Sequence, residues 1–202
     1  MLSGHFVEIN DFLIYVHPKV YPPSDDTFAL VEALEMLPDS TEEEMAIDIG
    51  CGCGILALIM ARKGYKVIGT DINPYAIKCS IINSYINGLR YKIRFIQGDL
   101  FAGVEFKFRV VVFNPPYLPP SESLKDDYLA MSTEGGLQVI MRFLRLLSHH
   151  LAPNGEALIV APDIYHDTLL RMSKELGFSM DTVSERKLAW ERLLVIRVIR
   201  SS

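Results

Sequence analysis

The chain has 202 residues, of which half are apolar and 22% are charged, so the composition predicts a globular protein and excludes a disordered one. Its net charge is −5, from 20 basic and 25 acidic residues, and no basic stripe runs along it, which weighs against nucleic acid as a substrate. The length predicts a single domain over residues 1–202, with an N-terminal extension at 1–40 and a main body at 45–202.

The apolar runs are far shorter than a membrane span, and the N-terminus has no basic-then-apolar signal pattern, so we expect no membrane contact. The three cysteines, Cys51, Cys53 and Cys79, form no CxxC pair and no zinc-ligand spacing with the five histidines. We therefore expect no metal site and a reduced, cytoplasmic protein.

The N-terminal extension is predicted to hold a hairpin and a helix. These elements are a pair of strands at 5–10 and 12–16 and a helix that begins after Ser24 and runs through Met36. The hairpin turns at Asn10-Asp11. Ser24 is a favoured N-cap residue, and Asp25 and Asp26 suit the first turn of a helix because its N-terminus favours negative charge.

From residue 45 onward, apolar strands alternate with amphipathic helices. The predicted strands are Met45–Ile49, Lys66–Thr70, Ile93–Gln97, Arg109–Phe113 and Glu156–Val160, and the predicted helices are Gly54–Arg62, Pro74–Asn87, Gly136–Leu151 and Tyr165–Leu176. Residues 179–188 and 191–199 are predicted to close the chain as an antiparallel pair. Continuous apolar strands between helices indicate a parallel sheet with helices on both faces, and the closing pair makes that sheet mixed.

A glycine-rich loop, Asp48–Gly54, stands where the first of these strands meets its helix. Glycines let the backbone approach a ligand closely, and a helix N-terminus favours a carboxylate or phosphate. A dinucleotide oxidoreductase would carry GxGxxG, but counting from Gly50 places Ile55 where the last glycine belongs. Asp48 also suits a cationic amino group on the ligand, which a pyrophosphate lacks.

Two further acids follow the next two strands. Asp71 stands where a carboxylate can take both hydroxyls of a ribose, and Asp99 follows the third strand, where it can accept from an adenine amino group. Three successive strand ends therefore offer a glycine loop, a ribose acid and an adenine acid. A ligand that combines an amino acid, a ribose and an adenine is S-adenosylmethionine, which we take as the predicted cofactor.

The motif Asn114-Pro115-Pro116-Tyr117 follows an apolar strand. The two prolines remove two backbone donors and fix two φ angles, so their carbonyls project outward. The oxygens of Asn114 and Pro115 can each accept one hydrogen of a planar NH2 group while Tyr117 stacks on its plane. The alternative is a proline-rich turn after a buried strand, without a chemical role.

Together these residues resemble a class I S-adenosylmethionine-dependent methyltransferase that acts on amino groups. The NPPY form resembles the branch that methylates glutamine in class 1 translation release factors. The segment Tyr21–Phe28 is similar to the Y-x-P-x-(E/D)-D-(T/S)-F segment of the short eukaryotic and archaeal HemK-type enzymes. The resemblance covers nearly the whole chain and implies a Rossmann-like fold, with a seven-stranded mixed sheet whose last strand is antiparallel.

The resemblance also implies a reaction and its residues. The reaction is N5-methylation of the glutamine in the GGQ motif of a release factor. The implied catalytic residues are Asn114, Pro115 and Tyr117, which bind the substrate together with Pro116. The implied cofactor-binding residues are Thr27, Asp48, Gly50, Asp71, Asp99, Leu100 and Asn114. Thr27 would lie near the methionine carboxylate, although a hydrogen bond at the start of its helix is an equal explanation.

A small zinc-binding Trm112-like activator is a further implied partner. In relatives it augments the exposed sheet edge, which here is the strand around Ile93, within 91–96. The alternative is an ordinary charged edge that discourages aggregation. Residues 118–133 could cover the substrate as a flap, although a solvated loop is the commoner outcome for such a sequence.

Two other functions compete with glutamine methylation. The first is N-methylation of an exocyclic base amine in RNA or DNA, which fits Asn114–Tyr117 but not the acidic charge balance. The second is a binding subunit that keeps the cofactor pocket without activity. Lysine methylation as a side activity also stays open. It would require deprotonation of the lysine ammonium first, and no evident base stands beside Asn114.

Overall fold

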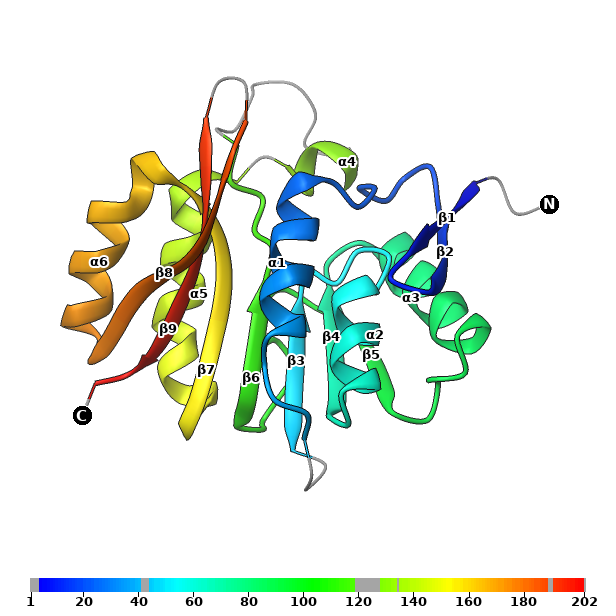
Figure 1. Cartoon of the computed structure of the whole chain (residues 1–202), viewed down its shortest axis with the longest axis horizontal. Helices are drawn as coiled ribbons and strands as arrows, with labels where there is room; N and C mark the ends of the chain where they lie inside the picture. Colours follow the sequence, from blue (N-terminus) through cyan, green and yellow to red (C-terminus); the bar gives the residue numbers. More distant parts are fainter. Residues whose placement is uncertain (1–3, 41–43, 119–127, 134, 189–190, 202) are drawn as a thin grey trace.

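The computed structural model describes residues 4–40, 44–118, 128–133, 135–188 and 191–201. It contains a seven-stranded sheet of order β5-β4-β3-β6-β7-β9-β8 and a separate two-stranded hairpin, β1-β2 (Figure 1). The sheet strands are β3 (Met45–Ile49), β4 (Lys66–Asp71), β5 (Ile93–Gln97), β6 (Phe108–Phe113), β7 (Leu151–Pro162), β8 (Phe178–Lys187) and β9 (Arg192–Arg200). The hairpin strands are β1 (His5–Ile9) and β2 (Phe12–Val16).

The helices are α1 (Asp25–Glu35), α2 (Ile55–Arg62), α3 (Pro74–Ile86), α4 (Tyr128–Met131), α5 (Gly136–His150) and α6 (His166–Glu175), with a 3-10 turn at Asp163–Tyr165. None of the helices within the described ranges is both long and apolar enough to cross a membrane. Strands β5, β4, β3, β6 and β7 pair with one another in parallel. Strand β9 is antiparallel to both of its neighbours, β7 and β8. The predicted mixed sheet with an antiparallel last strand is therefore confirmed.

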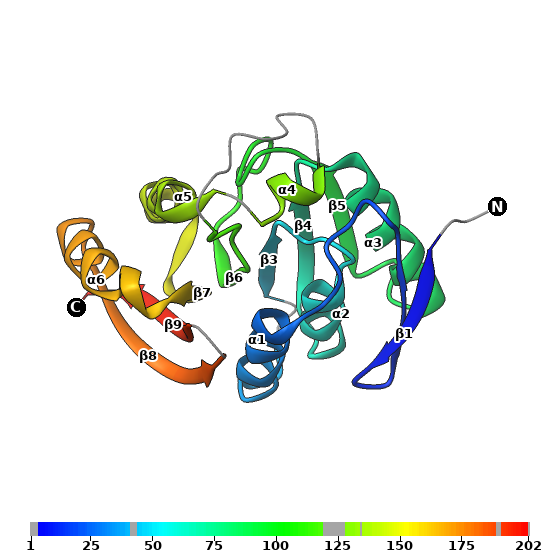
Figure 2. The same cartoon turned by 90° about the horizontal axis from the view of Figure 1, so that it is seen from above.

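Helices cover both faces of the sheet (Figure 2). Successive strand residues point to opposite faces, so Val110 and Val112 pack with α1, α2 and α3, whereas Val111 and Phe113 pack with α5 and α6. The sheet is thus buried on both sides, which explains why its strands are continuously apolar.

Two elements differ from the sequence prediction. Strand β7 begins at Leu151 instead of Glu156, although Pro153-Asn154-Gly155 is typical of a turn. Gly155 permits this pairing because it has no side chain. A Cβ at this position would lie only 2.6 Å from the carbonyl oxygen of Phe108 on the adjacent strand. The short helix α4 was not predicted, since four residues carry no readable periodicity.

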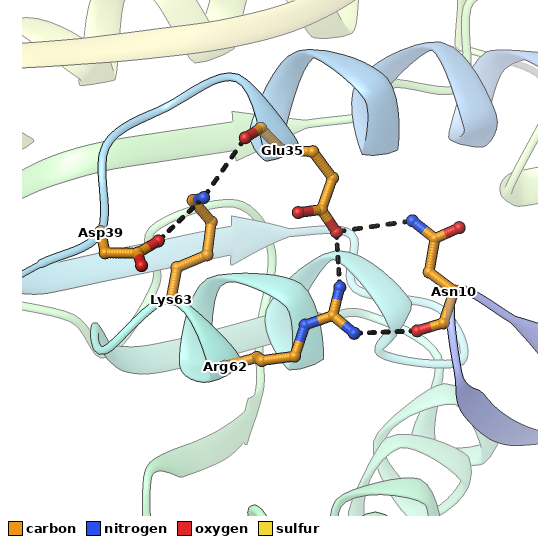
Figure 3. Close-up of polar contacts among 5 residues, drawn as sticks. All are labelled: Asn10, Glu35, Asp39, Arg62 and Lys63. Carbon is orange, nitrogen blue, oxygen red and sulfur yellow. Dashed lines mark hydrogen bonds and ion pairs between the residues drawn. The ribbon is translucent and has the colours of Figure 1, made fainter.

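A polar cluster joins the ends of α1 and α2 to the hairpin turn (Figure 3). Arg62 donates to the carbonyl of Asn10 at 2.9 Å and forms an ion pair with Glu35. Lys63 reaches the carbonyl of Glu35 at 3.3 Å and the carboxylate of Asp39 at 3.0 Å. The N-terminal extension is therefore fixed to the main body at the end of α1 that lies away from Ser24.

Two asparagines, one in α3 and one at its C-terminal cap, bind the backbone of β2. The side chain of Asn83 accepts from the Tyr15 amide at 2.8 Å and donates to the carbonyls of Tyr15 and Cys53, each at 2.8 Å. One turn later, Asn87 bonds the amide and the carbonyl of Leu13 at 3.1 and 2.9 Å. Asn83 is completely buried, so it joins the hairpin, α3 and the glycine-rich loop in one network.

We expect Asn83→Ala to reduce the free energy of unfolding by about 1–3 kcal/mol, because it removes three buried hydrogen bonds to the backbone. Asn87→Ala is the control, since Asn87 caps the same helix and bonds the same strand, but its contacts with that strand are exposed. Urea denaturation of the two variants measures the difference. Equal losses from both would show that the Asn83 network adds no stability.

Candidate active site

The pocket lies at the point where the strand order reverses. The chain passes from β3 to β4 and β5 on one side of the sheet and from β6 to β7 on the other, and such crevices at the carboxyl ends of parallel strands bind ligands. Ile49 of β3 lies opposite Phe113 of β6, so the residues that follow them, Gly50 and Asn114, leave the sheet side by side. Both line the pocket.

The glycine-rich loop forms one wall. Gly50, Gly52 and Gly54 have φ values of 66°, 54° and 86°, which other residues adopt only with strain. A Cβ at Gly52 would meet no atom within 4 Å, so the loop leaves open space above its backbone. Asp71 holds this loop in place, because its carboxylate accepts from the amides of Gly52 at 2.9 Å and Asn73 at 2.8 Å. Burial raises the pKa of Asp71.

Asp48 lies beneath the loop and is absent from the described residues that line the pocket. It is 1% exposed, and its Oδ2 accepts from the Ala57 amide at 3.0 Å, in the first turns of α2. Its Oδ1 is buried and has no hydrogen-bond partner among the described residues. Burial therefore raises the pKa of Asp48 to about 8. Contact of Asp48 with a ligand ammonium group stays a prediction.

The Asn114–Tyr117 corner forms the opposite wall, and all four of its residues line the pocket. The Nδ2 of Asn114 donates to Thr27 Oγ1 at 3.3 Å, while its buried Oδ1 has no partner among the described residues. The Tyr117 hydroxyl donates to Asp26 Oδ2 at 3.4 Å. Burial, and then the charge of Asp26, raise the pKa of Tyr117, so this phenol stays protonated. The corner thus holds a buried acceptor that no described group uses.

Asp99 and Leu100 line the far end of the pocket. Asp99 is half exposed, and its Oδ2 accepts from Arg142 of α5 at 2.8 Å. Leu100 has a φ of 53°, an uncommon value for a bulky residue, and the hydroxyl of Thr70 bonds its carbonyl at 2.8 Å. Thr27 also lines the pocket, and its hydroxyl donates to Asp26 Oδ1 at 3.2 Å. The ligand contacts expected of these residues stay predictions.

Several pocket residues were not identified from the sequence. They include Tyr21, Asp26, Asn73 and Val139, whereas Tyr128 and Met131 belong to the segment 118–133 that was considered as a flap. Asp26 was assigned only to the helix dipole, yet it lies four residues before the buried Leu30, and this spacing places it on the inner face of α1. Of the proposed flap, residues 119–127 lie outside the described residues. Tyr128, in α4, contacts the ring of Tyr75 edge-on at 5.9 Å.

Comparisons with known proteins identify the family of this chain. A family model described as "Methyltransferase small domain" matches residues 24–187. A putative protein N5-glutamine methyltransferase of Methanocaldococcus jannaschii is 35% identical over 96% of this chain and 98% of its own length. The methyltransferase HEMK2 of Homo sapiens is 30% identical over 90% of each chain.

A solved structure shares the fold. It is the E. cuniculi Mtq2–Trm112 complex, described as responsible for methylation of the eRF1 translation termination factor. The matched chain is 24% identical, with a TM-score of 0.69 over 91% of this chain and 99% of that one. At this identity the likeness establishes the Rossmann-like architecture alone.

We expect Asp48→Asn to stabilise the ligand-free protein progressively as the pH rises from 5 to 8. A carboxyl whose pKa is raised in the folded state contributes most stability below its unfolded pKa and loses it as the pH rises toward the folded value of about 8. The asparagine has no such loss. Melting temperatures across this range measure the difference, at roughly 2–4 °C for each kcal/mol. A difference that is constant with pH would contradict the raised pKa.

Proposed function

The chain belongs to the methyltransferase small domain family, and on that premise we propose that it transfers a methyl group from S-adenosylmethionine to N5 of a protein glutamine. The proposed substrate is the GGQ motif of a class 1 translation release factor. The relative of Methanocaldococcus jannaschii, matched over nearly its whole length, supports the glutamine specificity through its name. The observation that carries the proposal is the unpartnered, buried Oδ1 of Asn114 at the wall of the pocket.

The pocket fits S-adenosylmethionine, which supplies a methyl group activated by a sulfonium. The open space above Gly52 accommodates the methionine part, and the orphaned Oδ1 of Asp48 beneath the loop favours a nearby ammonium group. Asp71 is placed to take the ribose hydroxyls. Asp99 and Leu100 would hold the adenine, and Thr27 and Asn114 would complete the cofactor site.

The nitrogen of a carboxamide is a poor nucleophile, because its lone pair is delocalised into the carbonyl. Asn114 Oδ1 and the Pro115 carbonyl would accept its two N–H bonds and draw the nitrogen toward tetrahedral geometry. Within the described ranges no donor is bonded to either oxygen, so neither acceptor is engaged by the protein itself. The Tyr117 ring would stack on the amide plane and fix its direction.

This mechanism needs no strong base at the amide. The nitrogen becomes acidic once it carries the new methyl group and a positive charge, and its proton can then pass to water. Most of the acceleration would come from positioning, which is worth on the order of 7–11 kcal/mol when two reactants are held in line. The raised pKa of Tyr117 agrees with this mechanism, because its phenol stays protonated and does not act as a base.

We further propose that residues 1–202 act as one domain in the cytoplasm and that a small zinc-binding partner of the Trm112 type adds to the edge of the sheet. Strand β5 is the terminal strand of the sheet, so one of its edges has no neighbour in it. Beside this edge, Arg90 lies over the rings of Tyr85 and Tyr91, at 4.5 and 4.9 Å. Tyr91 is 92% exposed, which suits a contact surface.

We expect Asn114→Ala to abolish methyl transfer to the release factor, whereas calorimetry should still detect binding of S-adenosylmethionine, weakened at most by the loss of the one contact with Asn114. The variant removes an acceptor that acts on the substrate amide. Asn87→Ala, which lies outside the pocket, serves as the control and should keep full activity.

Labelled S-adenosylmethionine and mass spectrometry identify the acceptor. The proposal predicts a methyl group on the glutamine of the GGQ motif. Label on RNA or DNA instead would favour the base-amine function, and no transfer to any acceptor would favour a binding subunit. Normal turnover by the Asn114→Ala variant would refute the mechanism.

For the partner, we expect Tyr91→Ala to weaken binding of a co-expressed Trm112-type protein by roughly tenfold or more, as for an aromatic hot spot. Isothermal calorimetry measures this change. Phe106→Ala is the control, because Phe106 is also an exposed aromatic residue but lies in the connection before β6. Equal affinities of the two variants would place the interface elsewhere, and no binding by the wild type would remove the partner proposal.

A further inference from the structure

The start of α1 holds two adjacent acids in different environments. The side chain of Asp25 is 58% exposed and forms an ion pair with Arg186 at 3.2 Å. Asp26 is only 4% exposed. A carboxylate that serves only the helix dipole gains nothing from burial, and burying it carries a desolvation cost. The burial of Asp26 therefore needs another explanation.

Both oxygens of Asp26 bind groups of the active site. Its Oδ1 accepts from the amide of Thr27 at 2.6 Å and from the Thr27 hydroxyl at 3.2 Å. Its Oδ2 accepts from the hydroxyl of Tyr117 at 3.4 Å. One buried carboxylate thus connects α1 with the Asn114–Tyr117 corner, which lies about ninety residues further along the chain.

These bonds determine which end of the Asn114 amide faces Thr27. A carboxylate oxygen can only accept, so the single hydroxyl hydrogen of Thr27 is committed to Asp26. The oxygen of Thr27 can then only accept from Asn114, and the group that reaches it must be Nδ2, at 3.3 Å. Oδ1 is left directed away from Thr27, as the acceptor without a partner.

We propose that Asp26 is a positioning residue that fixes the polarity of the Asn114 amide through Thr27 and the place of Tyr117 through its hydroxyl. The proposal rests on the proposed function, in which Asn114 Oδ1 accepts from the substrate amide. If the Asn114 amide were turned over, its NH2 group would meet the NH2 group of the substrate, and two donors would oppose each other. Asp26 excludes this arrangement.

Asp26→Asn is the direct test, because it keeps the shape of the side chain but adds a donor. The backbone amide of Thr27 can only donate, so it favours the asparagine oxygen and directs the new NH2 group to the Tyr117 hydroxyl, which can no longer donate there. If the asparagine turns over, its NH2 group instead meets the Thr27 amide and hydroxyl, so in either orientation one link to the corner is lost. We expect kcat to fall roughly 10- to 100-fold, as for a misplaced reacting group. The dissociation constant for S-adenosylmethionine and the melting temperature should change little. Asp25→Asn is the matched control and should keep the wild-type kcat.

Thr27→Val removes the hydroxyl that links Asp26 to Asn114 and provides a second variant. If Asp26 acts through Thr27, the double variant should have nearly the same kcat as the more impaired single variant. Losses that multiply in the double variant, or a wild-type kcat in Asp26→Asn, would overturn the proposal. Should Asp26→Asn fail to fold, the kcat of Thr27→Val together with the spectrum described next decides the matter.

A measurement without substrate separates this proposal from the proposed function. In the wild type, nuclear Overhauser contacts should join the side-chain NH2 of Asn114 to Thr27. Asp26→Ala, which frees the Thr27 hydroxyl to donate to Asn114 Oδ1, should lose them while Asp25→Ala keeps them. Their absence in the wild type would refute the positioning role whatever the protein methylates. Their presence, combined with no transfer to a release factor, would refute the proposed substrate and leave the positioning role supported.

Discussion

The parallel pairing of β3 with β6 is the constraint on which the pocket depends. Ile49 lies opposite Phe113, so the glycine-rich loop and the Asn114–Tyr117 corner emerge next to each other at the point where the strand order reverses. On the other side of β3, Ile49 lies opposite Thr70, which brings Asp71 to the same edge. Backbone hydrogen bonds within a buried sheet therefore place both walls of the pocket, and the loops add only local shape.

The N-terminal extension completes this arrangement. One end of α1 is fixed by Arg62 and Lys63 of the neighbouring helix (Figure 3), and the other end carries Asp26 and Thr27 into the pocket. A helix anchored in this way is a rigid support for side chains that must be held within a fraction of an ångström. The corner supplied by β6 and the support supplied by α1 act together, although they are far apart in the sequence.

The sequence was sufficient for the sheet, because apolar strands buried on both faces are easily distinguished from amphipathic helices. It also located the glycine-rich loop and the Asn114–Tyr117 corner, whose composition is unusual. The sequence did not predict where β7 begins, because only the close approach of Gly155 to Phe108 on the adjacent strand shows that the strand includes this glycine. Asp26 was missed as a site residue for a similar reason: the helix dipole accounts equally for Asp25 and Asp26, and only the tertiary contact with Tyr117 separates them.

Charge explains why this pocket suits a cationic cofactor better than a pyrophosphate. Asp71 offsets its desolvation with two backbone amides, whereas Asp48 has one amide and an orphaned oxygen. The resulting increase in the pKa of Asp48 means that its anion is costly while no positive group is near. An ammonium group close to the loop would stabilise that anion, and a phosphate would raise its cost further. A glycine-rich loop of this kind binds phosphates in other proteins. Here the buried Asp48 would instead favour the ammonium group of an amino acid.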